Sequence, residues 1–423
     1  MTSSATVSRR EADTIIEQLR GGTPPQHSAS AYSSGMDEFL GVVRRRHLAP
    51  EPVAGKVRFV HGSWGSGKTH FFRLLTEVAF DERWLVSSVE LSAQETPFNR
   101  FELVLFSIIR NIAPPAPSTS SPSSAPFGDV LRAVLEREAG EGGDLPSAAQ
   151  RMSERLFADA SIDIDVKRVV RAYWDTFTGE SVDEVVLEER RGLLLQWFAG
   201  EAHRPTMRKE FGVQKVVGKE NARTILTSLT ALIQLLGYKG LLVLFDESEM
   251  THSTMSRSSL KQAHNNLLHL LNETGEVPGL FLIYAAVPEF FTDPKTGVVI
   301  YGALAARIGN VPDHRPKALD KVWNLDAHAN EPVVYEDAAE KIRELYEIAY
   351  PEERDALLPV AELRRRIRTI AEEHGPYHAT SRWRVVIKET TKLLDNSLEG
   401  VELLEPEASY RETLSALERM GDD

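Results

Sequence analysis

The chain has 423 residues, of which 42% are hydrophobic and 26% charged, and its formal net charge is −13. This composition is typical of a soluble globular protein with two or three domains, and the acidic balance argues against a protein that coats nucleic acid with its whole surface. The absence of cysteine excludes disulfides and thiolate metal sites, and with no apolar run of eighteen residues and no apolar signal core at the N-terminus we expect a cytoplasmic protein without a membrane span.

The first fifty residues are predicted to be a helical lead-in. Residues 8–21 have apolar side chains at helical spacing and end at a Gly-Gly pair, which is a typical helix stop. After a polar loop, a second amphipathic helix carries Phe39, Leu40 and Val43 on one face.

A short apolar strand is predicted over residues 56–61, and it runs directly into the pattern G-x-x-x-x-G-K-T, which cradles nucleotide phosphates. Its glycines permit backbone conformations closed to residues with a Cβ, so that successive N–H groups can point at phosphate oxygens. Lys68 would bring a mobile charge to the β- and γ-phosphates, and the Thr69 hydroxyl would bind Mg²⁺. A helix over 69–79 would add the positive end of its dipole. The predicted ATP-binding residues of this stretch are Gly62, Ser63, Trp64, Gly65, Ser66, Gly67, Lys68, Thr69 and His70.

The segment from Tyr32 to Met36 precedes this loop in the sequence, and two interpretations of it are open. It can form part of an adenine pocket, because a lead-in of this kind packs beside the base in many ATPases. It can equally be a plain linker to the helix that follows.

Beyond the loop, a second strand is predicted over 85–91 and a second apolar helix over 101–112. Residues 113–126 are then almost entirely Pro, Ser, Ala and Thr, a composition that cannot bury a core and predicts a flexible linker. Residues 127–220 contain three or four helical patterns and no convincing strand. We therefore interpret 114–220 as a linker and helical insertion within an α/β core.

The core resumes with a helix over 221–236 and a continuous apolar strand over 240–247, which ends in Asp246 and Glu247. A strand that is apolar on both faces and ends in two carboxylates is the Walker B pattern. Asp246 would hold Mg²⁺, usually through water, and Glu247 would polarise the attacking water. These roles complement those of the glycine-rich loop, which strengthens both assignments.

A further apolar strand is predicted over 279–287, and Glu289, just past its end, is expected to have a structural role. The next helix carries Arg307 at a position where an arginine finger between subunits could lie, and a surface ion pair is the alternative. From residue 331 the pattern is helical.

The C-terminal part is charged unevenly. Residues 361–392 hold eight basic side chains against four acids, a balance of +4, whereas 393–423 hold nine acids against two arginines, a balance of −7. The basic cluster could contact DNA, but a solvated helix face is the favoured interpretation. Within it, Arg382 follows Ser381, which could cap a helix over 383–394. We predict that Arg382 senses the nucleotide; the alternative is a solvated or DNA-facing patch.

With both signatures in place, the chain resembles the ATP-binding proteins of bacterial BREX-type phage-defence systems, P-loop proteins akin to the AAA+/STAND ATPases. Besides the glycine-rich loop, the resemblance rests on stretches that cover most of the chain except the insertion: Arg9–Arg10 through Leu19–Pro25, Gly35–Leu40, Val89–Ser92 with Thr96–Pro97, Phe245–Glu249, and Ser381–Arg382. The unusual Trp64 inside the loop and the Pro/Ser-rich linker depart from the family, and neither affects nucleotide binding. The resemblance implies a cytoplasmic ATPase that works on DNA with other defence proteins, such as a helicase or methyltransferase.

The sequence therefore predicts an α/β P-loop NTPase of the AAA+/STAND type: a parallel sheet flanked by helices, a helical insertion, and a C-terminal helical or winged-helix lid. The expected parts are a lead-in (1–50), the two halves of the ATPase core (51–113 and 221–330), the linker and insertion between those halves (114–220), and the lid (331–423).

The predicted function is Mg²⁺-dependent ATP hydrolysis that drives a conformational or assembly switch, with self-association and with turnover that is low or stimulated by a partner. The alternative is a nucleotide-gated scaffold that binds ATP with little turnover and acts through protein contacts. A small-molecule kinase is disfavoured, because an Asp-Glu pair suits water activation and no acceptor pocket is visible.

Overall fold

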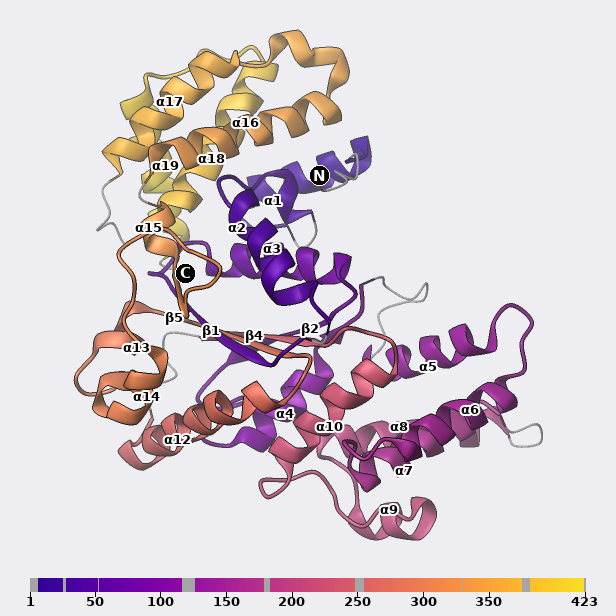
Figure 1. The fold of residues 1–423 in the computed structure, drawn as a ribbon. Coiled ribbons are helices and arrows are strands. Elements are labelled where there is room, and N and C mark those ends of the chain that lie inside the picture. The colour runs from indigo at the N-terminus through magenta and orange to yellow at the C-terminus, as the bar shows by residue number, and fades with distance from the viewer. Residues whose placement is uncertain are drawn as a thin grey trace. The chain divides into compact units, whose positions relative to one another are not determined.

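The computed structural model describes residues 7–25, 28–51, 53–115, 126–178, 183–247, 255–329, 331–374 and 381–421 (Figure 1). The chain divides into two compact units. Unit 1 comprises residues 1–43, 60–78 and 311–423, and unit 2 comprises residues 44–59 and 79–310.

The described strands form one six-stranded sheet in the order β3-β2-β4-β5-β1-β6. Their bounds are β1 Lys56–His61, β2 Leu85–Leu91, β3 Ile112–Ala113, β4 Leu241–Glu247, β5 Leu280–Ala286 and β6 Val322–Asn324. β4 lies parallel to both β2 and β5, and β3 is antiparallel to β2. Every residue of β5 is buried, as expected for a strand covered on both faces. The predicted mixed α/β fold with a mostly parallel sheet flanked by helices is confirmed.

Two strands were not predicted from the sequence. β3 contains only two residues, and it lies where the sequence predicted the end of a helix; that helix, α4, is Phe101–Arg110. β6 contains three residues. Neither is long enough to show an apolar period, so their strand conformation depends on pairing with neighbours distant in sequence.

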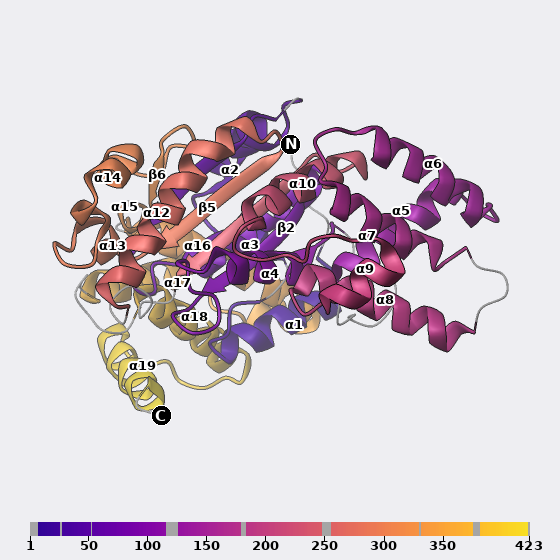
Figure 2. The same ribbon diagram turned by 90° about the horizontal axis from the view of Figure 1, so that it is seen from below.

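In unit 2, α4 packs on β2, and Figure 2 shows α4 and α10 across that part of the sheet.

The described part of the insertion contains five helices rather than three or four, and it contains no strand. Apart from the end of α3, which the two units share, the α-helices described in unit 2 are α4 Phe101–Arg110, α5 Pro126–Ala139, α6 Leu145–Ala158, α7 Ile164–Asp175, α8 Glu184–Ala199, α9 Arg204–Phe211, α10 Ala222–Leu235, α12 Arg257–Glu273, α13 Pro288–Thr292 and α14 Gly302–Ile308. Most of the predicted linker, residues 116–125, lies outside the described residues.

The insertion has its own core, built around two buried indole rings. Trp174 of α7 is fully buried and donates from Nε1 to the Leu131 carbonyl of α5, 3.1 Å away. Trp197 of α8 is also fully buried and donates to the Lys215 carbonyl at 2.9 Å. Each buried N–H is thus satisfied, which removes the main cost of burying tryptophan.

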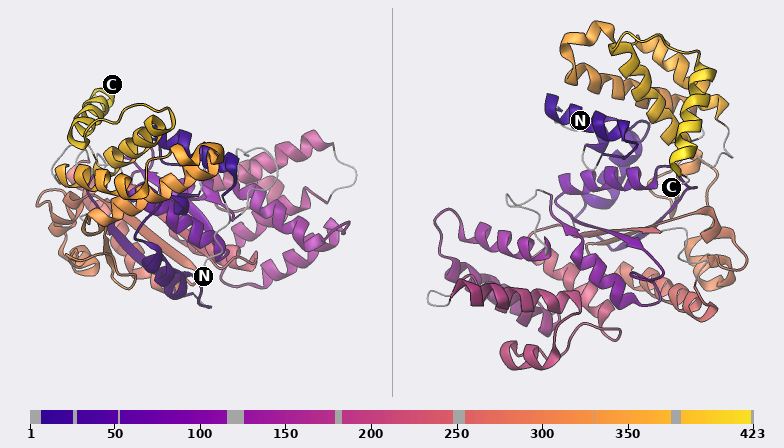
Figure 3. Two further views of the ribbon diagram at one scale, coloured as in Figure 1. Left: turned by 90° about the horizontal axis from the view of Figure 1, so that it is seen from above. Right: turned by 180° about the vertical axis from the view of Figure 1, so that it is seen from behind.

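Unit 1 contains both the N-terminal and the C-terminal segments of the chain. Its helices are α1 Arg9–Arg20, α2 Asp37–Val43, most of α3 Lys68–Asp81, α15 Leu325–Ala329, α16 Pro332–Ala349, α17 Val360–Glu373, α18 Arg382–Leu398 and α19 Pro406–Gly421. α1 packs against α16 and α18, as Figure 3 shows. From residue 331 on, the described residues form helices and no strand, and the choice between a helical and a winged-helix lid stays a prediction.

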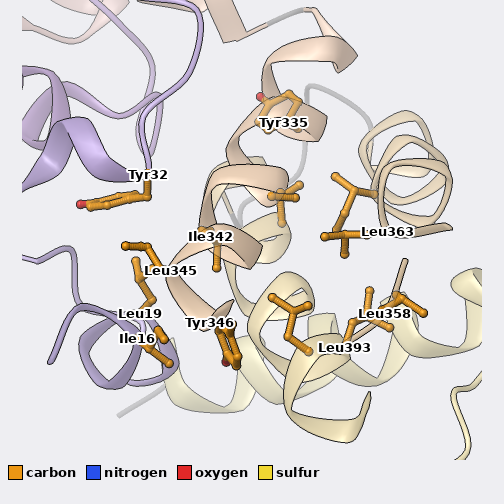
Figure 4. Close-up of a cluster of buried hydrophobic side chains, with 14 of the residues drawn as sticks. Ile16, Leu19, Tyr32, Tyr335, Ile342, Leu345, Tyr346, Leu358, Leu363 and Leu393 are labelled. Carbon is orange, nitrogen blue, oxygen red and sulfur yellow. The ribbon is translucent and has the colours of Figure 1, made fainter. Parts of the chain in front are cut away.

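The core of unit 1 buries apolar side chains of α1 together with those of α16, α17 and α18 (Figure 4). Ile16 points into this cluster and is fully buried. At the edge of the cluster, Arg20 donates from Nε to both carboxylate oxygens of Asp395, at 2.9 and 3.1 Å, and Tyr346 donates to the same carboxylate at 2.8 Å. Burial, with Asp395 nearby, raises the pKa of Tyr346, so the phenol stays a donor.

Candidate functional site

The glycine-rich loop, residues 62–69, connects β1 to α3 and adopts conformations that only glycine tolerates well. Gly65 has φ +69° and Gly67 has φ +95°. A Cβ on Gly62 would lie 2.2 Å from Ser66 Oγ, which is closer than atoms can approach. The backbone path therefore requires glycine at positions 65 and 67, and at position 62 a Cβ would displace the Ser66 side chain.

Lys68 and Ser66 line the inside of this loop. Lys68 Nζ donates to the carbonyl oxygens of Gly62, at 2.9 Å, and Ser63, at 3.0 Å. Ser66 Oγ is buried, and no residue that the structure describes gives it a hydrogen bond. An ammonium on a mobile stem, an orphaned hydroxyl and a backbone that excludes Cβ atoms fit a phosphate group. The Thr69 side chain, at the start of α3, is exposed.

An acidic residue that the sequence analysis missed holds the first half of the loop. Asp326, in the first turn of α15, accepts from the backbone N–H of Ser63 at 2.9 Å and from its hydroxyl at 2.7 Å. Next to this contact, His61 Nδ1 lies 3.2 Å from Oδ1 of Asn324 in β6. No local pattern could have identified Asp326, because it is 263 residues away from Ser63 in the chain.

The beginning of α18 lies directly on the loop. Ser381 donates from its hydroxyl to the Gly65 carbonyl at 2.5 Å. Ser381 occupies the N-cap position of α18, as predicted, but its side chain makes no capping hydrogen bond, so the prediction that its side chain caps the helix is wrong. The hydroxyl is already used by Gly65. Residues 375–380, which precede Ser381, lie outside the described residues.

Two tryptophans flank the loop region. Trp64 is 62% exposed, which is unusual for so large an apolar side chain. The Trp383 ring lies near Gly67, since a Cβ placed there would be 3.9 Å from it. Four other tryptophans, Trp84, Trp174, Trp197 and Trp323, are fully buried.

His70 connects the loop helix to the candidate adenine segment. Its Nδ1 lies 3.2 Å from the Tyr32 hydroxyl, and the two ring centroids are 4.9 Å apart. Burial, with Arg73 nearby, lowers the pKa of His70 to about 4, so the imidazole is neutral at pH 7. Tyr32 and Met36 are themselves buried. The segment thus packs on α3, and its role as an adenine pocket or as a linker stays a prediction.

In unit 2, Asp246 and Glu247 are the last two residues of β4. Asp246 is half-buried, and it pairs in the sheet with Glu90 of β2, whose side chain is exposed. The described residues include no group of three side chains that could form a complete metal site, so Mg²⁺ would need the oxygens of a phosphate or of water as further ligands. Glu249 lies outside the described residues, and Glu289 is exposed in the first turn of α13.

The two predicted catalytic or sensing arginines differ in their surroundings. Arg307, in the last turn of α14, is exposed and has no hydrogen bond or ion pair among the described residues. Arg382 donates to the carbonyls of His374, at 2.9 Å, and Ala329, at 3.4 Å, and its guanidinium lies 5.8 Å from the centre of the Tyr335 ring. Burial, the largest influence on Tyr335, raises its pKa to about 12.

Most of the basic side chains in residues 361–392 are neutralised within unit 1. Arg364 lies 2.8 Å from Asp337, and Arg368 lies 2.6 Å from Glu336, a carboxylate that is 1% exposed. Carboxylates also pair with Arg365, Arg366 and Lys392, whereas Arg382 and Lys388 donate to backbone carbonyls. Only Arg384 has no partner among the described residues. This is the arrangement expected of an ion-paired helix face.

The family comparison extends over almost the entire chain. The model of the BREX system ATP-binding protein BrxC/D matches residues 7–413. The chain belongs to this family. No curated protein and no solved structure matches it.

Membership in the BrxC/D family supports ATP as the ligand and antiviral defence as the setting. The cradle of residues 62–69 is the feature that fits the phosphates of that ligand, since it combines the required glycines with Lys68 and the orphaned Ser66 hydroxyl. None of the helices in the described part of this BrxC/D protein is long and apolar enough to span a membrane.

Proposed function

We propose that this BrxC/D protein is a P-loop NTPase of the AAA+/STAND type that binds ATP with Mg²⁺ at residues 62–70 and hydrolyses it. Hydrolysis drives a conformational or assembly switch in cytoplasmic anti-phage defence. The observation that carries the proposal is the loop itself, where the backbone requires Gly65 and Gly67, Gly62 leaves room for the Ser66 side chain, and Lys68 donates to the loop carbonyls. The ammonium group of this lysine donates hydrogen bonds to two neutral carbonyl oxygens. It can donate them instead to phosphate oxygens, which are stronger acceptors because they carry more negative charge.

The residues divide the chemistry among them. Lys68 pairs with the β- and γ-phosphates, and the loop N–H groups hold their oxygens. Thr69 and Asp246 would hold Mg²⁺, Asp246 usually through water, and the ion would supply positive charge to the phosphates. Glu247 accepts the proton of the attacking water. Support for the last two roles comes from the Asp-Glu pair at the end of an apolar strand, together with family membership.

Arg307 and Arg382 are proposed to act on the γ-phosphate. Arg307 is an exposed guanidinium with no partner among the described residues, which suits a group that acts in a second copy of the chain. Self-association and action with other BREX proteins, such as a helicase or methyltransferase, follow from this proposal and the family. Arg382 follows the serine that contacts Gly65, so a small change at the loop can reach it through the backbone.

A second candidate function is a nucleotide-gated scaffold, which would bind ATP with little turnover. The contact of Ser381 with Gly65 favours it, because it links the loop directly to α18 and so offers an output through protein contacts. The two functions share binding and differ in hydrolysis.

The test measures ATP affinity and turnover separately. Lys68→Ala removes a charge-assisted contact of roughly 1.5–3 kcal/mol, so affinity should fall at least about tenfold, whereas Lys261→Ala on exposed α12 should leave it unchanged. Glu247→Gln should keep wild-type affinity and lose Mg²⁺-dependent hydrolysis. Unchanged affinity in Lys68→Ala would refute the ATP site. Wild-type turnover near zero, with and without duplex DNA, would favour the scaffold.

A further inference from the structure

A basic surface whose side chains have no acidic partner among the described residues lies in the insertion, on α9 and the segment that follows it. Residues 204–219 hold five basic side chains against one acid, Glu210, a local balance of +4 in a chain whose net charge is −13. All five basic residues are exposed. We define them as the α9 basic patch: Arg204, Arg208, Lys209, Lys215 and Lys219.

The backbone beneath the patch is well held. The chain turns after α9 and runs back along it, with the Val213 N–H donating to the Met207 carbonyl at 3.2 Å and Arg204 Nε donating to the Gln214 carbonyl at 3.3 Å. Met207 and Val213 are each 1% exposed and anchor the patch to the core of the insertion. Arg204, Pro205, Arg208 and Lys209 line a surface hollow of about 530 Å³.

The side chains of the patch have no acidic partner. The side chains of Arg208, Lys209, Lys215 and Lys219 make no hydrogen bond or ion pair among the described residues, and the side chain of Arg204 donates only to a backbone carbonyl. Other arginines of the same insertion are paired: Arg151 and Arg155 of α6 both contact Glu138, and Arg191 of α8 contacts Glu184 and Glu188.

Without acidic partners, the basic side chains of α9 repel one another. Arg204 and Arg208 are four residues apart on one helix, where like charges repel by a few tenths of a kcal/mol. Elsewhere in the insertion, an arginine has an acid at such a position, as Arg132 has Glu136. An external anion would offset the repulsion at α9.

The chemistry of the patch favours phosphates over a protein or exposed bases. Its single aromatic residue, Phe211, is half-buried, so the patch lacks the stacking platform that binds unpaired bases. Of the apolar residues between the cations, Met207, Val213 and Val217 are buried, Val216 is half-buried and only the small Pro205 is exposed, so the patch also lacks the large apolar centre of a protein interface. What remains is an array of point charges and guanidinium groups.

We propose that the α9 basic patch binds the phosphate backbone of duplex DNA without reading its base sequence. Contacts of this kind position a protein on DNA and depend strongly on salt. The proposal places DNA binding on the insertion rather than on residues 361–392, where most basic side chains already have partners within unit 1. It does not depend on hydrolysis of ATP.

The test measures binding of the full chain to two fluorescent duplexes of unrelated sequence by anisotropy, across a series of salt concentrations. In Arg208→Gln/Lys209→Gln, affinity should fall equally for both duplexes, and the slope of log K against log salt should become shallower by about 2, or about 1 for each lost phosphate contact. The matched control, Arg151→Gln/Arg155→Gln, makes the same change in net charge on an exposed helix of the same insertion and should keep the wild-type slope.

Three results would overturn the proposal: no binding of either duplex by the wild-type chain, an equal change of slope in the control, or binding of poly-glutamate as tight as that of duplex DNA, which would assign the patch to an acidic protein. If the first variant fails to fold, Lys215→Gln/Lys219→Gln is measured against the same predictions. ATP affinity should be unchanged in all these variants, so a failure here is distinguishable from a failure of the ATP site.

Discussion

Gly65→Ala tests whether α18 truly rests on the glycine-rich loop. Gly65 has φ +69°, and a Cβ there would lie 2.2 Å from the Cβ of Ser381. Ser381 would have to move, and its 2.5 Å hydrogen bond to the Gly65 carbonyl would break. Gly400 is the matched control, because it belongs to the same unit and has φ +68°, yet a Cβ there meets nothing within 4 Å.

The expected magnitudes follow from these contacts. A Cβ in the left-handed region costs about 1–2 kcal/mol, so Gly400→Ala should lower the free energy of unfolding by that amount. Gly65→Ala adds the loss of a hydrogen bond, about 0.5–1.5 kcal/mol, and the displacement of Ser381. Ser381→Gly should cost about 1 kcal/mol, since it loses the same bond but no capping bond. In the double variant the Ser381 Cβ that would clash with a Cβ at position 65 is absent, and the hydrogen bond from residue 381 to the residue 65 carbonyl is lost only once.

The assay is a double-mutant cycle by urea unfolding. Gly65→Ala and Ser381→Gly should be non-additive by roughly 1 kcal/mol, with the double variant less destabilised than the sum. Additivity within about 0.5 kcal/mol, or equal effects of Gly65→Ala and Gly400→Ala, would refute the contact between α18 and the loop.

Three further predictions concern single residues. If Arg307 acts in a second subunit, specific ATPase activity should rise with protein concentration in the wild type and not in Arg307→Ala, and a flat wild-type profile would argue against this role. Arg382→Ala should lower the ratio of ATP to ADP affinity; an unchanged ratio with weakened DNA binding would assign Arg382 to nucleic acid instead. The pKa of His70 is lowered from 6.5 to about 4 by burial, so the unfolded chain binds the proton first, and stability should fall as the pH decreases from 6.5 to 4. His70→Gln should remove part of that slope, and an unchanged slope would contradict a neutral His70 in the folded chain.

The sequence by itself predicted the elements whose chemistry is local. The glycines of residues 62–69 are separated by fixed spacings, and their need for special backbone angles is a property of single residues, so the loop and its flanking strand and helix were predictable. The apolar runs of β4 and β5 likewise specify strands buried on both faces. Asp246 and Glu247 were identified because they end such a run.

The tertiary structure decided which distant side chains hold the loop and which charges are already paired. Asp326 and Ser381 reach the loop from 263 and 316 residues away. No sequence pattern marks Asp326, and the pattern around Ser381 predicted a helix cap rather than a contact with Gly65. The +4 balance of residues 361–392 suggested a basic surface, yet Glu336 and other acids opposite neutralise most of it, whereas the equal balance of residues 204–219 stays unpaired. A count of charges along the chain considers only residues that are neighbours in sequence. Electrostatic pairing depends on the distances between side chains, and these distances are set only when the helices pack together.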